Sequence, residues 1–251
     1  MADNGEGRVR METSGELNNA VLSTYFDPER VGKCHLETKC PVVTVSRAFG
    51  ANASVIAELL ADSLTVPCFD YALVDRIAKE LKTDKQLVRL IDEKSPKPMD
   101  KWHYSSVTKG VCSRVGYYRL VVKAILAIAE GGGVIVGRGA HLVLAHHPRV
   151  FRVRIDGSLD VRSKRVAERE KISLRAAREM AIRVDEERKR YLKEIHKIHP
   201  TQRIDYDLLI NSDEIGPHTA VEIIVSVMEK MGYYVPGSTT IEQAGTTPPP
   251  R

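Results

Sequence analysis

Short apolar runs alternate with longer amphipathic segments along the middle of the chain, and this alternation restricts the folds that the chain can adopt. Residues 41–46 (PVVTVS) form an uncharged, β-branched run that predicts a buried strand. Residues 54–64 follow with apolar side chains at helical spacing, which predicts a helix with one buried face. Repetition of such strand–helix steps is typical of an α/β domain in which helices cover a parallel sheet.

The same alternation continues towards the C-terminus. We expect further strands at residues 134–136, 150–155 and 207–211, and further helices at residues 118–130, 159–171, 173–198 and 218–231. Ser158 and Ser173 are predicted to cap the two helices that follow them. The glycines at 131–133 predict the end of the helix before them.

The two ends of the chain differ in composition from this middle part. Residues 1–39 are polar at the start and are expected to be a partly disordered tail, and residues 237–251 are rich in Pro, Gly and Thr and are expected to be disordered. Residues 40–236 are therefore the expected domain. No apolar stretch is long enough to span a bilayer, and the start lacks the apolar region of a secretory signal, so we expect a cytoplasmic protein without a membrane partner.

The four cysteines, Cys34, Cys40, Cys68 and Cys112, form no CxxC pair and have no histidine at finger spacing. This argues against a zinc site. In a cytoplasmic protein the expected state of these cysteines is the free thiol.

The positive charge of the chain is unevenly distributed. Residues 149–203 carry 17 Lys/Arg against 9 Asp/Glu, whereas the whole chain has a net charge of +5. Such a region fits a nucleic acid, an acidic membrane surface or a polyphosphate ligand, and composition alone favours solvated helices with ion pairs along them. No aromatic RNA-binding motif, KH loop or zinc knuckle accompanies the charge, so no specific nucleic-acid partner is expected.

The first expected strand leads directly into a loop of small residues and then a helix (SRAFGANAS, residues 46–54). This order directs free backbone N–H groups and the helix dipole at a phosphate. When the GxxxxGK[ST] pattern is aligned so that its hydroxyl falls on Ser54, its lysine falls on Ala53 and its last glycine on Asn52. The hydroxyl for Mg²⁺ is kept and the lysine is lost, and asparagine tolerates the positive φ of a loop glycine. An ordinary strand–helix turn fits this loop equally well.

Six segments in order, SRAFG, PCFDYALVDRIA, VIVGRGAHLVL, VFRVRIDGSLDVRSKRV, VDEERKRY and DYDLLINSDEIG, resemble the cytidylate kinase-like family over residues 40–236. The resemblance implies a three-layer P-loop kinase fold with a parallel sheet, a helical lid and a helical acceptor-binding insert. It also implies a transferase that moves the γ-phosphoryl group of ATP, with Mg²⁺, to a pyrimidine nucleoside monophosphate, CMP or dCMP. Family members commonly have a glycine-rich loop where this chain has residues 51–53 (ANA), so the phosphate loop is degenerate.

The resemblance also suggests roles for individual residues. The expected binders of the ATP phosphates are Ser46, Gly50, Ala51, Asn52, Ala53, Ser54 and Arg165, with Ser54 also the Mg²⁺ ligand. The expected catalytic residues are Arg47, Arg138, Arg162, Asp185 and Arg188, with Arg47 replacing part of the charge of the lost lysine. The expected acceptor-binding residues are Asp70, Tyr71 and Arg138.

Several alternatives stay open at this level. Asp70 could serve only as the cap of the following helix, and Arg138 could be a turn residue paired with a carboxylate. The arginines could belong to a nucleotide sensor without turnover, or, less favoured, to an RNA-binding module. The acceptor and homo-oligomerisation are also left open by the sequence.

Overall fold

The computed structural model describes residues 40–83, 114–147, 149–198, 206–233 and 235–236; the predicted tails, 1–39 and 237–251, lie outside them. Within these residues, five parallel strands form one sheet in the order β2-β3-β1-β4-β5. The strands are β1 (Val42–Arg47), β2 (Cys68–Phe69), β3 (Gly133–Val136), β4 (Val150–Asp156) and β5 (Leu208–Asn211).

The buried β1 is the central strand. In the register of the sheet, Thr44 lies beside Ile135 of β3 and Arg152 of β4. Because all strands run the same way, their carboxyl ends meet at one edge of the sheet, which is where ligands bind in open α/β sheets.

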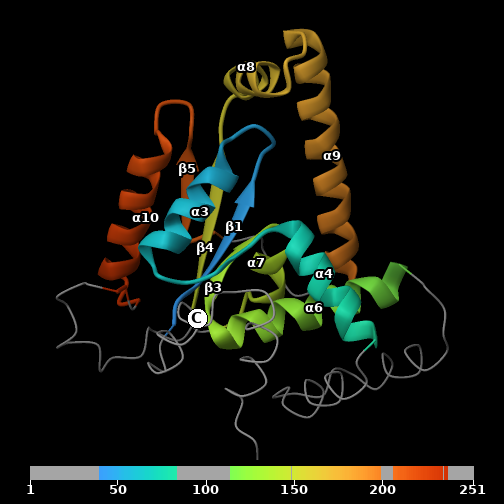
Figure 1. Ribbon diagram of the computed structural model, residues 1–251, viewed down its shortest axis with the longest axis vertical. Helices are drawn as coiled ribbons and strands as arrows, with labels where there is room; N and C mark the ends of the chain where they lie inside the picture. Colours follow the sequence, from blue (N-terminus) through green and yellow to red (C-terminus); the bar gives the residue numbers. More distant parts are fainter. Residues whose placement is uncertain (1–39, 84–113, 148, 199–205, 234, 237–251) are drawn as a thin grey trace, which may run out of the picture.

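Helices cover both faces of the sheet (Figure 1). One face packs against α3 (Ala53–Ser63) and α10 (Pro217–Lys230), and its core includes Val43 and Phe151. The other face packs against α4 (Tyr71–Thr83), α6 (Arg114–Gly131) and the short α7 (Ala140–Val143). Helix, sheet and helix therefore form the three layers that the alternating sequence predicts.

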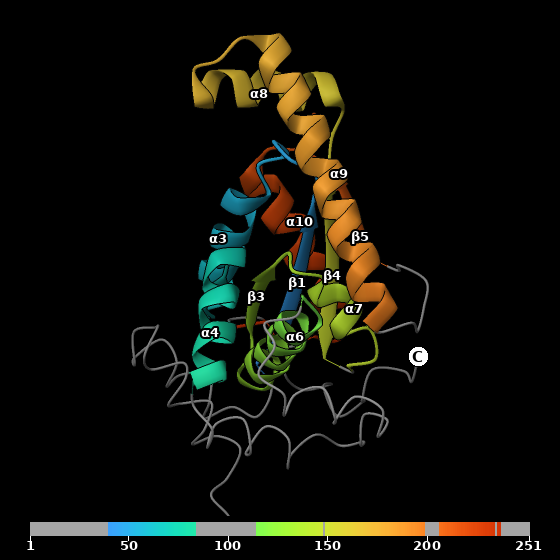
Figure 2. The same ribbon diagram turned by 90° about the vertical axis from the view of Figure 1, so that its right-hand side faces the viewer.

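Two further helices, α8 (Leu159–Glu170) and α9 (Leu174–Ile198), extend beyond the carboxyl edge of the sheet. Figure 2 shows α8 lying across the end of the molecule and α9 descending beside the sheet. The Ser158 side chain accepts a hydrogen bond from the N–H of Val161, and the Ser173 side chain accepts one from Ala176. Both predicted N-caps are confirmed, and α8 and α9 occupy the place of the expected helical lid.

The structure departs from the sequence prediction in its shortest elements and in one cysteine. The two-residue β2 and the four-residue α7 were not expected, because neither is long enough to show a period. Cys40 is disulfide-bonded, so the expectation of a free thiol is wrong for this residue, whereas Cys68 is a free thiol. None of the helices in the described ranges has the length and hydropathy that a bilayer crossing requires.

Candidate functional site

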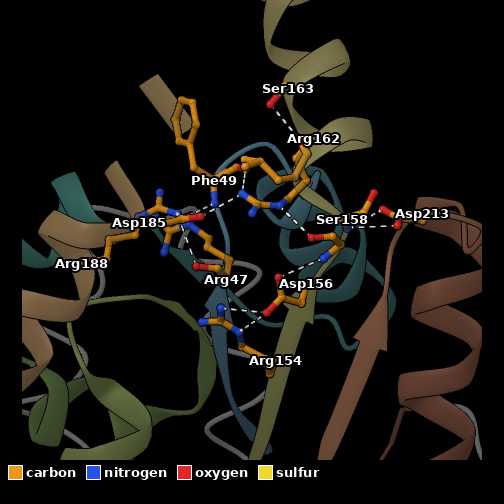
Figure 3. Close-up of polar contacts among 12 residues, drawn as sticks. Arg47, Phe49, Arg154, Asp156, Ser158, Arg162, Ser163, Asp185, Arg188 and Asp213 are labelled. Atoms are coloured by element: carbon orange, nitrogen blue, oxygen red, sulfur yellow. Dashed lines mark hydrogen bonds and ion pairs between the residues drawn. The ribbon is translucent and has the colours of Figure 1, made fainter. Parts of the chain in front are cut away.

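A cavity of about 1020 Å³ lies at the carboxyl edge of the sheet. Its lining comes from the β1–α3 loop, the β3–α7 turn, the end of β4 and the two lid helices. Figure 3 shows the polar contacts at its upper end, where the loop meets α8 and α9. The cavity is therefore the place where the predicted phosphate loop, strand ends and lid come together.

The β1–α3 loop has two residues in the left-handed region, Gly50 and Asn52. Asn52 adopts a left-handed conformation with φ of 58°, as expected for an asparagine in place of a glycine. Gly50 also has a positive φ, of 80°, and a Cβ there would lie 2.8 Å from the carbonyl oxygen of Arg162. Glycine is thus required at position 50 both by its conformation and by the closeness of α8.

The N-terminus of α3 is open to the cavity. Asn52 makes no side-chain cap, and the first helical hydrogen bond is donated by the N–H of Ile56 to the carbonyl of Asn52. The N–H groups of the three preceding helical residues, Ala53, Ser54 and Val55, consequently have no acceptor within the helix. All three residues line the cavity, so the helix presents free donors and its positive dipole end to a ligand.

Arg47, the last residue of β1, brings a cation to this loop without a carboxylate partner. Its guanidinium packs against Gly137, where an added Cβ would lie 2.5 Å from Nη1, and lies 5.9 Å from the ring centroid of Tyr71. Among the described residues its side chain makes no hydrogen bond and no ion pair. Burial, together with the charge of Arg188, lowers the pKa of Arg47 to about 10. A desolvated cation in this state favours an anionic ligand.

Arg162, in contrast to Arg47, donates hydrogen bonds to several acceptors of the protein. Its Nη1 donates to the carbonyl of Phe49 at 2.7 Å and to Asp185 Oδ2 at 2.8 Å, and its Nε donates to the carbonyl of Gly157 at 2.8 Å (Figure 3). Asp185 Oδ1 in turn accepts from the N–H of Phe49 at 2.8 Å. The pair therefore fastens the phosphate loop to the lid helices.

Arg188 of α9 has weaker contacts with protein acceptors than Arg162 has, but among the described residues it is not without them, as Arg47 is. Its Nη1 donates to the carbonyl of Arg47 at 3.3 Å and lies 3.9 Å from Asp185 Oδ1, while its guanidinium lies 5.6 Å from the ring centroid of Phe49. Burial lowers the pKa of Arg188. Arg188 thus places a second, loosely paired cation beside Arg47.

Arg138 lies in the β3–α7 turn with a positive φ of 50°. Its Nε donates to Asp75 Oδ1 at 2.7 Å, and its Nη2 bonds to the other oxygen of the same carboxylate. The guanidinium lies between the rings of Tyr71 and Tyr191, 5.5 and 5.1 Å from their centroids. The alternative of a turn arginine paired with a carboxylate is therefore present in the structure, in the wall of the cavity.

Comparison with known proteins adds an independent observation. The sequence model of the cytidylate kinase-like family matches residues 42–214. The chain belongs to the cytidylate kinase-like family. The cytidylate kinase of Methanobrevibacter smithii is 26% identical over 190 residues, which cover 75% of this chain and 98% of that protein.

Solved structures give the corresponding result for the fold. An uncharacterised protein from Eubacterium ventriosum superimposes with a TM-score of 0.57 at 22% identity, covering 75% of this chain and 98% of that one. The parallel sheet, the helical layers and the family together confirm the predicted α/β P-loop kinase fold. This member of the cytidylate kinase-like family is thus kinase-like, and its family implies a nucleotide ligand.

Two residues expected to contact ligands are used elsewhere in the structure of this cytidylate kinase-like protein. Asp70 Oδ1 accepts from the N–H of Leu73 at 2.7 Å, so Asp70 caps α4, as the alternative interpretation had it. Arg165 donates to the hydroxyl and the carbonyl of Ser212 at 3.1 and 2.6 Å and is outside the cavity lining. Tyr71, in contrast, does line the cavity, with 51% of its surface exposed.

The residues at the loop fit a magnesium–nucleotide complex in a limited way. Proteins usually hold Mg²⁺ by one or two side chains together with substrate phosphates and water. Ser54 is exposed in the cavity at the start of α3 and can be such a ligand. No group of three or more His, Cys, Asp or Glu side chains that could hold a metal occurs within the described part of the chain. The donor set therefore suits Mg²⁺ carried by phosphates.

The cavity lining also includes residues to which the sequence analysis assigned no role, among them Phe49, His141 and Arg154. Phe49 is held at both backbone groups by lid residues, and His141 and Arg154 line the cavity, the latter paired with Asp156 at 2.9 Å. Arg154 could have been noticed, because it lies two residues before the end of a strand. Phe49 and His141 lie within SRAFG and VIVGRGAHLVL, two segments of the family resemblance, but neither was assigned a role from them.

Proposed function

We propose that this chain transfers the γ-phosphoryl group of ATP, bound with Mg²⁺, to a pyrimidine nucleoside monophosphate, CMP or dCMP. The observation that carries the proposal is the open N-terminus of α3 beside the unpaired guanidinium of Arg47. Free N–H donors and an unpaired cation at one cavity wall are what a polyphosphate requires. The similarity to a cytidylate kinase supports the choice of a pyrimidine acceptor.

The residues present suit a reaction that depends on positioning and charge. An oxygen of the acceptor phosphate forms a bond to the γ-phosphorus while the bond from that phosphorus to the β-phosphate oxygen breaks. No general base is needed, because the acceptor phosphate is already ionised. Arg47 and Arg188 would stabilise the charge on the transferred group, and the free N–H groups of α3 would hold the β-phosphate. Ser54, together with the phosphates, would hold Mg²⁺, which would supply further charge neutralisation.

The acceptor would lie on the side of the cavity formed by α4 and the β3–α7 turn. Arg138 uses Nε and Nη2 for Asp75, and its remaining nitrogen, Nη1, is available to an acceptor phosphate. The exposed ring of Tyr71 lies against the same guanidinium and offers a surface for a base. Asp75 and Tyr117, joined by a hydrogen bond of 2.6 Å, would hold Arg138 in place.

A second candidate, a nucleotide sensor without turnover, is favoured by one observation. The position of the lost lysine is Ala53, which is only 3% exposed, and no other lysine comes from the loop. The remaining positive charge of the site would then be sufficient to bind the β- and γ-phosphates. It would be too small to stabilise the transfer of the γ-phosphoryl group.

Thermal melting with ATP–Mg²⁺, with CMP and with both, next to a coupled assay for nucleoside diphosphate formation, tests the proposal. A shift with each nucleotide and formation of CDP support the kinase. A shift without CDP selects the sensor, and the absence of any shift rejects both. UMP and GMP, run in the same way, test the choice of acceptor.

A further inference from the structure

A chain of hydrogen bonds links Ser46 and His141, two residues of the cavity lining, to Tyr206 just before β5. Ser46 Oγ lies 2.9 Å from His141 Nδ1, and His141 Nε2 lies 3.3 Å from the hydroxyl oxygen of Tyr206. Ser46 is the residue of β1 before Arg47, and His141 lies on α7. Both are buried, with exposures of 6% and 3%, although both touch the cavity.

The protonation state of His141 decides what this chain can do. Burial, together with the charges of Arg154 and Arg152, lowers the pKa of His141 to about 4. The imidazole is therefore neutral at physiological pH, so one ring nitrogen donates a hydrogen bond and the other accepts one.

Two arrangements satisfy this requirement. In the first, Nδ1–H donates to Ser46 Oγ and the hydroxyl of Tyr206 donates to Nε2, which leaves the hydroxyl hydrogen of Ser46 free to point into the cavity. In the second, Ser46 donates to Nδ1 and Nε2–H donates to Tyr206, so that Ser46 offers only lone pairs to the cavity. The choice of tautomer thus sets whether Ser46 is a donor or an acceptor for a ligand.

The surroundings favour the first arrangement. A phenol is a better hydrogen-bond donor than acceptor, and the unprotonated imidazole nitrogen is a strong acceptor. Among the described residues, the hydroxyl of Tyr206 has no acceptor other than this nitrogen. The cavity next to Ser46 is cationic, because Arg47 and Arg188 lie there, and an anionic ligand needs donors.

We propose that His141 and Tyr206 are positioning residues that hold the hydroxyl of Ser46 as a hydrogen-bond donor to an anionic oxygen of the bound ligand. The identity of that oxygen as a phosphate oxygen rests on the proposed function, whereas the tautomer does not. Tyr206 is outside the cavity lining, so its effect on a ligand would have to pass through His141.

Proton–nitrogen NMR of isotope-labelled full-length protein at neutral pH tests the tautomer directly. The His141 signals are assigned by their loss in His141→Asn. We expect a protonated Nδ1 and an unprotonated Nε2, and a protonated Nε2 would overturn the proposal. This measurement needs no ligand, so it decides the inference even if ATP does not bind.

A double-mutant cycle tests the connection to the ligand, with the dissociation constant of ATP–Mg²⁺ as the readout. Ser46→Ala should weaken binding about tenfold, as expected for one hydrogen bond to a charged group. Tyr206→Phe, which removes a single oxygen, should weaken binding severalfold in the wild-type background and not at all in the Ser46→Ala background. Equal effects of Tyr206→Phe in both backgrounds would overturn the relay.

Two substitutions of His141 separate hydrogen bonding from packing. His141→Asn keeps a donor near the position of Nδ1 and should retain most of the affinity, whereas His141→Leu should lose as much as Ser46→Ala. Melting temperatures of both variants are measured alongside. If Asn and Leu lose affinity equally while both proteins stay folded, His141 does not orient Ser46 and the proposal is wrong.

Discussion

Arg162 at the lid junction and Arg47 at the end of β1 lie on either side of the same phosphate loop, yet the protein uses them differently. Arg162 donates to three acceptors of the protein, the carbonyls of Gly157 and Phe49 and the carboxylate of Asp185. The Arg47 side chain lies against the ring of Tyr71 and the backbone of Gly137, and it has no hydrogen bond or ion pair with the residues that the structure describes. The family resemblance suggested a catalytic role for both.

The comparison shows that the state of a guanidinium's donors, rather than its place in a motif, indicates its role. An arginine whose donors are used holds the structure, because removing it leaves buried acceptors unpaired. An arginine that is buried without partners costs stability and is retained where a ligand completes its hydrogen bonds. On this basis we assign Arg162 to the architecture of the site and Arg47 to the ligand.

The largest effect should come from Arg162→Ala. The change removes the Arg162 donor from Asp185 Oδ2 and from two carbonyls, and loss of one member of a buried ion pair costs about 3 kcal/mol of unfolding free energy. Urea denaturation measures it. The control is Arg175→Ala, whose pair with Glu179 is highly exposed and should change the unfolding free energy by less than about 0.5 kcal/mol. Equal unfolding free energies for the two variants would contradict a structural role of Arg162.

The next effect is on binding and comes from Arg47→Met. The methionine keeps the apolar stem and removes the charge, so the dissociation constant for ATP–Mg²⁺ should rise about tenfold or more. Unfolding free energy should stay within about 0.5 kcal/mol of the wild type or increase, because a desolvated charge is removed. Lys164→Met changes the net charge equally on the exposed surface of α8 and should leave the affinity unchanged. If Arg47→Met lowered the unfolding free energy and left the affinity for ATP–Mg²⁺ unchanged, Arg47 would be an architectural residue like Arg162.

Arg138 is paired with a carboxylate, as Arg162 is, and also has a nitrogen available to a ligand, as Arg47 has. Arg138→Ala removes the partner of Asp75 and should lower the unfolding free energy by about 1–2 kcal/mol. It should also abolish the thermal shift produced by CMP and leave most of the shift produced by ATP–Mg²⁺. Equal weakening of both shifts would show that Arg138 is architectural only.

The smallest effect is expected from Ser54→Ala. If Ser54 binds Mg²⁺, its loss should weaken binding of ATP about threefold in the presence of Mg²⁺ and have no effect in EDTA, a difference of well under 1.4 kcal/mol. Ser63→Ala at the other end of α3 is the control. An equal loss in EDTA would make Ser54 a structural residue of the helix start.

The sequence predicted the local parts of this molecule and missed its long-range contacts. The buried run at 41–46 and the caps Ser158 and Ser173 depend on neighbouring residues, so their patterns were readable and were confirmed. The contacts of Phe49 with Asp185 and Arg162 join residues 136 and 113 positions apart, and no local pattern reports them. For the same reason the pairing of Arg138 with Asp75, 63 positions away, stayed one of two alternatives.

The most direct test is to follow the conversion of radiolabelled ATP and CMP to labelled CDP by the wild type and by Arg47→Met. Our account predicts that the wild-type protein forms CDP in a Mg²⁺-dependent reaction, and that Arg47→Met forms it far more slowly while remaining as stable as the wild type. Binding of both nucleotides by the wild type without formation of CDP would contradict phosphoryl transfer. Equal rates for the two proteins would contradict the assignment of Arg47 to the ligand.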